Sequence, residues 1–121
     1  MITLDGITFE CGIHCIRGRI GSGKSTLARR LRHEAEFSGQ RRVLLFQEIE
    51  YQITEDTIGK ELASWGVSGT EEAFSLFGMP DKNRDPYTLS RGELKRFLLA
   101  CILASNAECL ILDEPYASLD A

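Results

Sequence analysis

The stretch RGRIGSGKSTLARRL, residues 17–31, limits the possible folds of this chain more than any other. Its three glycines, at positions 18, 21 and 23, stand directly before a segment with helical spacing of apolar residues. Glycine weakens both helices and strands, so such a cluster needs a reason. The usual reason is a ligand that must approach the backbone closely. The stretch therefore predicts a binding loop between two regular elements.

The spacing of this loop indicates which ligand it takes. Gly18-x4-Gly23-Lys24-Ser25 fits the full phosphate-binding pattern, between an expected strand at 12–18 and an expected helix at 24–36. Backbone N–H groups of such a loop, together with the start of the helix, bind anionic oxygens. Lys24 is predicted to reach the terminal phosphates and Ser25 to ligate Mg²⁺. The alternative is a glycine turn without a ligand, which the strand–loop–helix context disfavours.

Composition excludes several classes of protein. The 121 residues are 43% apolar and 26% charged, as in an ordinary globular domain rather than a disordered or fibrous chain. The net charge of −4 argues against nucleic-acid binding through bulk electrostatics, so we expect no direct nucleic-acid partner. No apolar run has membrane-spanning length, and MITLDG lacks the pattern of a secretory signal. These features predict a cytoplasmic protein.

The order of the remaining patterns predicts an α/β fold with a parallel sheet and an inserted helical subdomain. The apolar runs that indicate buried strands, and the segments with helical periodicity, alternate along the chain. The expected elements are strands at 12–18, 42–46 and 109–113, two short helices within 55–78, and longer helices at 24–36 and 92–105. One domain would thus cover 1–121, with 1–54 and 106–121 as the nucleotide-binding core and 55–105 as the helical subdomain.

The four cysteines show no metal-binding spacing. Cys11, Cys15, Cys101 and Cys109 contain no CxxC pair. Small buried apolar residues in a reducing compartment are the simpler interpretation than a metal site.

Two carboxylates follow the last expected strand. LILDEP, residues 110–115, is an apolar run that ends in Asp113 and Glu114. A carboxylate at this edge of a strand can hold Mg²⁺ through water, and the next one can orient an attacking water. The alternative, two solvated acids at a strand end, is weakened because the apolar run implies burial beside them.

Three further stretches identify a family that the chain resembles. LSRGE (89–93) opens an amphipathic helix before LILDEP, SLDA (118–121) follows it, and Gln47 comes just after the strand VLLF. With the phosphate loop, these motifs resemble the ATP-binding-cassette ATPases from about Gly6 to Ala121, with LSRGE as the signature, SLDA as the D-loop and Gln47 as the Q-loop glutamine. The resemblance implies a P-loop NTPase core.

The resemblance also implies roles and partners. ATP and Mg²⁺ would be the cofactors, with Glu114 as general base and Gln47 beside the metal and attacking water. Ser90 and Gly92 would contact the γ-phosphate of ATP held by a second cassette, and a membrane transporter subunit would be a further partner. The nucleotide-binding loop residues would be Gly18, Arg19, Ile20, Gly21, Ser22, Gly23, Lys24, Ser25 and Thr26, and the metal would be held by Ser25, Gln47 and Asp113.

The sequence also departs from the family pattern. Arg91 and Glu93 replace the usual glycine and glutamine of the signature, and the switch histidine that follows the D-loop in the family is not part of this sequence. We therefore expect an incomplete cassette. FQEIEYQITEDTIGKEL (46–62) is similar to the energy-coupling-factor and cobalt-type importer ATPases.

Three functions stay open at this point. The first is the motor subunit of a membrane importer, on the cytoplasmic face of the membrane. The second is a soluble cassette protein in translation or DNA repair. The third is a nucleotide-binding module without hydrolysis, in line with the absent switch histidine. A nucleoside kinase or GTPase does not predict LSRGE before LILDEP.

Overall fold

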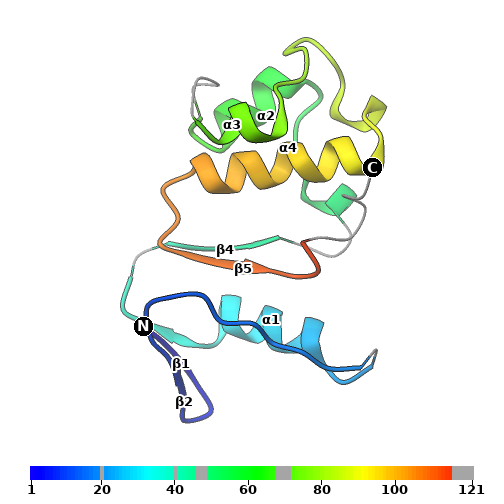
Figure 1. Ribbon diagram of the computed structural model, residues 1–121. Helices are drawn as coiled ribbons and strands as arrows, with labels where there is room; N and C mark the ends of the chain where they lie inside the picture. The colour runs from blue at the N-terminus through cyan, green and yellow to red at the C-terminus, as the bar shows by residue number, and fades with distance from the viewer. Residues whose placement is uncertain (20, 40, 46–48, 68–71, 116–121) are drawn as a thin grey trace.

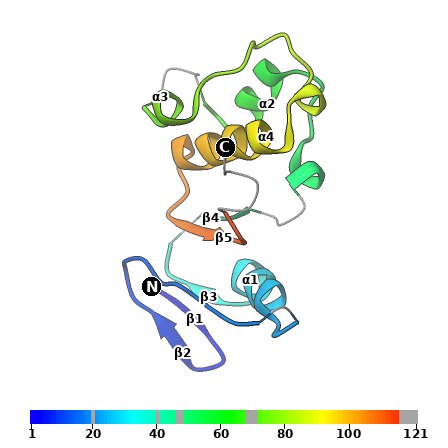
Figure 2. The ribbon, with the colours of Figure 1, turned by 45° about the vertical axis from the view of Figure 1, so that its right-hand side comes forward.

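In the part of the chain that the structure describes, a small parallel sheet lies between a single helix on one side and a group of three helices on the other. The computed structural model describes residues 1–19, 21–39, 41–45, 49–67 and 72–115. Figure 1 shows α1 (Lys24–His33) on one side of strands β4 and β5, and α4 (Arg91–Ala104) on the other. Helices α2 (Ile58–Ser64) and α3 (Ala73–Phe77) lie beyond α4 in the same group. Figure 2 shows the same three layers after rotation.

The central sheet confirms the predicted parallel pairing. Strand β4 (Arg42–Leu45) runs parallel to β5 (Cys109–Leu112), with Val43 opposite Leu110. The continuous apolar run of β4 is typical of a strand covered on both faces. Its last three residues are at most 8% exposed. The α/β class with a parallel sheet is therefore confirmed.

The larger core lies between β4 and the helices α2, α3 and α4. Val43 and Leu45 of β4 pack with Phe97, Leu98 and the other buried residues of α4. Gly66 and Gly78 have φ angles of 74° and 83° just after α2 and α3, where left-handed backbone ends a helix. At 14 residues α4 is the longest described helix. Within the described ranges, no helix is long and apolar enough to cross a membrane.

The smaller core lies on the α1 side of the sheet. Ile2, Leu4, Leu31 and Ala35 form it, with Cys109 and Ile111 of β5 packed against it. Helix α1 ends at His33, earlier than the predicted Glu36, because the chain turns into strand β3 (Glu36–Phe37). Glu36, which the helical spacing had assigned to the helix, pairs with Thr3 of β1 instead.

An N-terminal hairpin was not predicted. Strands β1 (Ile2–Leu4) and β2 (Ile7–Phe9) pair antiparallel around Asp5 and Gly6, whose φ angles are 51° and 78°. Asp-Gly between two alternating apolar runs is the strongest short hairpin signal, since both residues tolerate positive φ. The signal is present in the sequence as ITLDGITF, residues 2–9.

The predicted strand at 12–18 is wrong. None of these residues is in a strand, and Ile13 and Ile16 are 101% and 44% exposed. The described residues form only the sheets β2–β1–β3 and β4–β5, so no described strand pairs with this segment.

Two burial predictions also need correction. Cys11 and Cys15 are exposed, because they lie in and next to the unpaired segment, whereas Cys101 is buried and Cys109 half-buried. Leu110 and Leu112 are 37% and 38% exposed rather than buried. The reason is that β5 alternates, with Cys109 and Ile111 on the α1 core and the two leucines on the opposite face.

Candidate functional site

The glycine loop folds closely on itself before α1. Gly21 and Gly23 have φ angles of 83° and 92°, a backbone conformation that side chains disfavour. A Cβ atom on Gly18 would lie 2.5 Å from the Ser22 hydroxyl oxygen. The amide of Ser22 donates to the carbonyl of Arg19 at 3.0 Å. Left-handed backbone thus favours glycine at positions 21 and 23, and a Cβ atom at position 18 would displace the Ser22 side chain.

Lys24 is held against the loop that precedes it. Its ammonium donates to the carbonyl oxygens of Gly18 and of Arg19, the latter at 3.0 Å. An ammonium group has three N–H donors, of which these two bonds take two. The positive charge is therefore fixed at the loop, where helix α1 begins.

A pocket of about 450 Å³ joins the loop to the end of β5. Its lining contains two cationic residues, two hydroxyl side chains and one carboxylate. Its lining residues are Arg19, Gly21, Gly23, Lys24, Ser25, Thr26 and Glu114. The structure thus brings Glu114, 90 positions after Lys24, to the phosphate loop.

The chemistry of this lining fits a nucleotide phosphate with Mg²⁺. Phosphate oxygens accept from ammonium groups and from backbone N–H groups at the start of a helix. Mg²⁺ prefers oxygen ligands, which the hydroxyls of Ser25 and Thr26 and the carboxylate of Glu114 supply. The loop therefore supplies both the hydrogen-bond donors that a phosphate group requires and the oxygen atoms that Mg²⁺ prefers.

Glu114 stands in an uncommon backbone conformation. Its φ angle is 50°, in the left-handed region, which non-glycine residues seldom adopt. Its backbone carbonyl accepts a hydrogen bond of 2.7 Å from Nζ of Lys95 on α4. Lys95 is only 2% exposed, and burial, followed by the nearby Arg91, lowers the pKa of its ammonium.

Sequence reasoning missed Lys95. The residue lies in α4 between Leu94 and Phe97, both buried. A lysine on the apolar face of an amphipathic helix was the signal that could have found it, because buried lysines require a partner.

Other predicted site residues lie elsewhere. Asp113 is half-buried, and its amide donates to the carbonyl of Leu45 at 3.2 Å, but it is not among the lining residues of the pocket. Gly18 and Ser22 are part of the loop but do not line the pocket either. Ile20, Gln47 and the SLDA stretch lie outside the described residues.

Ser90 and Gly92 lie at the start of α4, away from the pocket. Figure 1 shows α4 on the opposite side of the sheet from α1 and its loop. The Ser90 hydroxyl accepts from the amide of Glu93 at 3.1 Å, and the Glu93 carboxylate accepts from the amide of Ser90 at 3.0 Å. The bond from the Ser90 amide to the carboxylate is the main cause that lowers the pKa of Glu93. Glu93 thus completes a capping box in this signature.

Arg91, the other departure from the signature, points to a carboxylate. Its guanidinium lies 3.3 Å from Glu50 of the 3₁₀ helix Ile49–Gln52. The positive charge of Arg91 thus forms an ion pair with Glu50 of the same chain.

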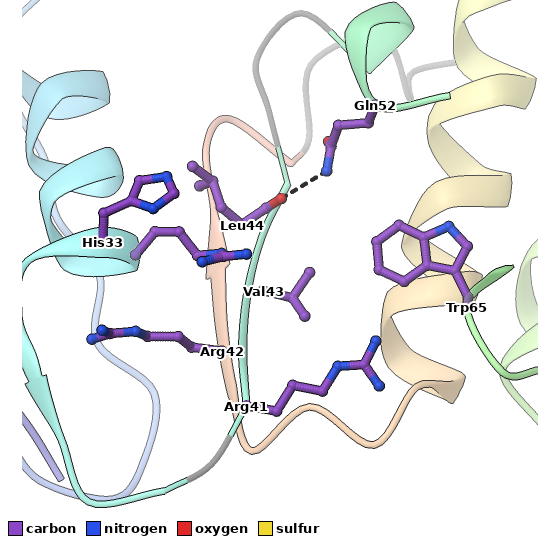
Figure 3. A pocket seen from close by; sticks show the side chains of 8 residues that line it. His33, Arg41, Arg42, Val43, Leu44, Gln52 and Trp65 are labelled. Carbon is purple, nitrogen blue, oxygen red and sulfur yellow. Dashed lines mark hydrogen bonds between the residues drawn. The ribbon is translucent and has the colours of Figure 1, made fainter. Parts of the chain in front are cut away.

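A second pocket, of about 550 Å³, lies at the opposite end of β4 (Figure 3). Figure 3 shows His33 on one side of the strand and Trp65 and Gln52 on the other, with Gln52 donating to the carbonyl of Leu44 at 2.8 Å. Arg42 donates to the carbonyls of Leu31 and Ala35 at the end of α1. Cations there stabilise the negative end of the helix dipole, which explains the basic lining of this pocket.

Comparisons with known proteins match most of the chain to one family. The family model described as ABC transporter matches residues 6–117. An energy-coupling factor transporter ATP-binding protein of Clostridioides difficile is 33% identical, over 97% of this chain and 54% of its own length. The corresponding protein of Halalkalibacterium halodurans is 33% identical, over 87% of this chain and 50% of its own.

A solved structure shows the same fold. An ABC transporter ATP-binding protein of Pyrococcus furiosus superposes with a TM-score of 0.69 at 24% identity, over 85% of this chain and 62% of that one. The chain spans about half the length of the curated relatives it matches.

Proposed function

Because the chain belongs to the ABC transporter family, we propose that it binds ATP with Mg²⁺ at the phosphate loop and hydrolyses it to drive a membrane transporter. The observation that carries this proposal is the pocket shared by Lys24, Ser25 and Glu114. It unites a phosphate-binding loop with a carboxylate that can act on water.

The loop amides and Lys24 would bind the phosphates. The family resemblance, rather than the pocket lining, adds Asp113 and Gln47 to Ser25 as the residues that would hold Mg²⁺, which when bound supplies charge to stabilise the reacting phosphate. The carboxylate of Glu114 would accept a proton from the attacking water. Its place in the pocket lining puts it beside the loop where the terminal phosphate would lie.

The names of the relatives support a role with a transporter, and the likeness of residues 46–62 to importer ATPases favours import. The two energy-coupling factor proteins match nearly the whole of this chain, and their names describe ATP-binding subunits of transporters. We therefore propose that this chain acts with a membrane subunit, at the cytoplasmic face of the membrane. We also propose the division into a nucleotide-binding core (1–54 and 106–121) and a helical subdomain (55–105).

A second cassette would complete the site. Ser90 and Gly92 start α4 on the far side of the sheet from the phosphate loop, so they do not reach the pocket of their own chain. The positive end of the α4 dipole at these residues suits a phosphate presented by a partner. Mg·ATP would then favour a dimer, because a ligand shared by two subunits stabilises their association.

Hydrolysis by the whole chain and by Glu114→Gln tests this function. The amide keeps the size of the carboxylate but cannot accept the proton, so turnover should fall by roughly 10²–10⁴-fold while Mg·ATP still binds. Glu10→Gln, an exposed carboxylate away from the pocket, is the matched control and should keep full activity. Turnover that survives in Glu114→Gln would exclude Glu114 as the base.

The composite site has its own measurement. Light scattering should show a larger mass for Glu114→Gln with Mg·ATP than without it. Ser90→Arg should prevent this increase but leave binding at the phosphate loop nearly intact. An unchanged mass in folded, nucleotide-bound protein would contradict the shared site.

A further inference from the structure

The ammonium of Lys95 is a buried charge that none of the roles above uses. Its side chain is 2% exposed, in the middle of a helix that is packed into the larger core. A buried ammonium group is costly unless it is paired or hydrogen-bonded. The partner that the structure gives it is the carbonyl oxygen of Glu114, at 2.7 Å.

The acceptor of this bond belongs to a strained turn. Glu114 has a φ angle of 50° directly after Asp113, where the chain leaves β5. A non-glycine residue in this region is held there by its surroundings, and such residues cluster at functional sites. The side chain of the same residue lines the phosphate-loop pocket. The bond from Lys95 thus reaches the backbone of the residue whose side chain lines the phosphate-loop pocket.

The donor is anchored more firmly than the acceptor. Helix α4 buries Leu94, Phe97 and Leu98 on both sides of Lys95, whereas Glu114 lies at a strand end. A hydrogen bond from a charged donor is roughly twice as strong as a neutral one. Helix α4 can therefore hold the backbone of Glu114 in place, whereas the turn at Glu114 does not hold the helix.

We propose that Lys95 is a positioning residue, which holds the backbone of Glu114 in its left-handed conformation and so keeps the Glu114 carboxylate at the phosphate loop. The catalytic consequence of this inference rests on the proposed function, but the positioning itself does not. Lys95 would contact neither nucleotide nor metal, and would act through Glu114 alone.

The positioning can be measured without hydrolysis. Backbone ¹³C chemical shifts of Glu114 report its φ angle, and an electron-mediated coupling between ¹⁵Nζ of Lys95 and the ¹³C′ of Glu114 reports the bond. Lys95→Met should fold, because methionine fills a buried site of similar length without a charge. In this variant the Glu114 shifts should leave their left-handed values, and Lys95→Arg should restore them in part.

A matched lysine serves as the control. Lys60 is a surface residue in an ion pair of 3.0 Å with Asp56, so Lys60→Met should leave the Glu114 shifts as they are. Unchanged shifts in folded Lys95→Met, or no coupling in the parent chain, would overturn the inference.

Kinetics give the second readout. In Lys95→Met kcat should fall by roughly 10–100-fold, since a small misplacement of a catalytic group has effects of this size. The Kd for Mg·ATP should stay within about twofold, because the lost interaction acts on the base and not on binding. Equal losses of affinity and kcat would indicate a structural role and contradict positioning. A parent chain that does not hydrolyse ATP would refute the proposed function, while the shifts of Glu114 would still decide the inference.

Discussion

Arg30 of α1 donates two hydrogen bonds to the carboxylate of Asp5, at 2.8 and 3.0 Å, across 25 positions of the chain. Asp5 is the turn residue of the N-terminal hairpin, and α1 is the helix that follows the phosphate loop. The same guanidinium donates to Glu34 at 2.9 Å. The hairpin is thus tied to the helix that carries Lys24 by a bidentate ion pair, and this bond lowers the pKa of Asp5.

Loss of this ion pair should have a small, salt-dependent effect. Asp5→Asn keeps a residue that tolerates positive φ but removes the charge, so the urea midpoint should fall slightly at low salt. The difference from the parent should shrink as salt is added, because exposed pairs are screened. Glu10→Gln, which removes an exposed charge outside the pair, should show no such salt dependence.

The capping box of α4 should make stability depend on pH. The folded pKa of Glu93 lies below its ordinary value of 4.5, chiefly because its carboxylate accepts from the Ser90 amide. The Glu93 carboxylate therefore binds a proton more weakly in the folded state than in the unfolded state. Its contribution is present above the unfolded pKa and is lost as the pH falls through the lowered folded pKa.

Glu93→Gln separates this contribution from those of other acids. Glutamine can close the same capping box but does not titrate, so the stability difference between parent and variant should change between pH 6 and pH 3. Urea titrations across this range measure it. Ser90→Ala, which removes the other half of the box, should lower the free energy of unfolding by about 1 kcal/mol at neutral pH. A stability difference independent of pH would contradict the bond between Glu93 and Ser90.

Replacement of Glu61, a buried carboxylate of helix α2, should lower the stability of the chain. Glu61 is 1% exposed, and its oxygens accept from the amides of Thr54 and Glu55 at 3.2 and 3.0 Å and from the indole N–H of Trp65 at 3.3 Å. In Glu61→Gln one oxygen is replaced by an NH₂ group, which then faces a donor. The free energy of unfolding should fall by about 1–3 kcal/mol.

Trp65 reports the same change directly. It is the only tryptophan of the chain, so its fluorescence should shift in Glu61→Gln but not in Glu10→Gln. A variant as stable as the parent, with unchanged fluorescence, would show that the amide satisfies the same donors.

The features predicted from sequence were those with a strong local signature. The apolar run of β4 and the periodicity of α4 predicted both elements within one or two residues, since burial decides their conformation. The phosphate loop was predicted from glycine spacing, and the structure brings Glu114 to it, in line with the role that the family resemblance implies for this residue.

The features missed from sequence depend on distant partners. Residues 12–18 look like a strand, but strand formation needs an adjacent strand, which the described sheets do not provide. The pairing of Lys95 with the Glu114 carbonyl joins positions 19 apart that no local pattern connects. Glu93 was interpreted as a departure from the signature, whereas its spacing from Ser90 is that of a capping box.

Isothermal titration calorimetry with Mg·ATP, on the parent chain and Lys24→Ala, tests the central claim most directly. A charge-assisted bond to phosphate contributes roughly 1.5–3 kcal/mol, so Lys24→Ala should bind at least tenfold more weakly. Lys60→Ala, which removes a surface ammonium elsewhere, should bind like the parent. Equal affinity of the parent and of Lys24→Ala would contradict the assignment of the nucleotide site to this loop.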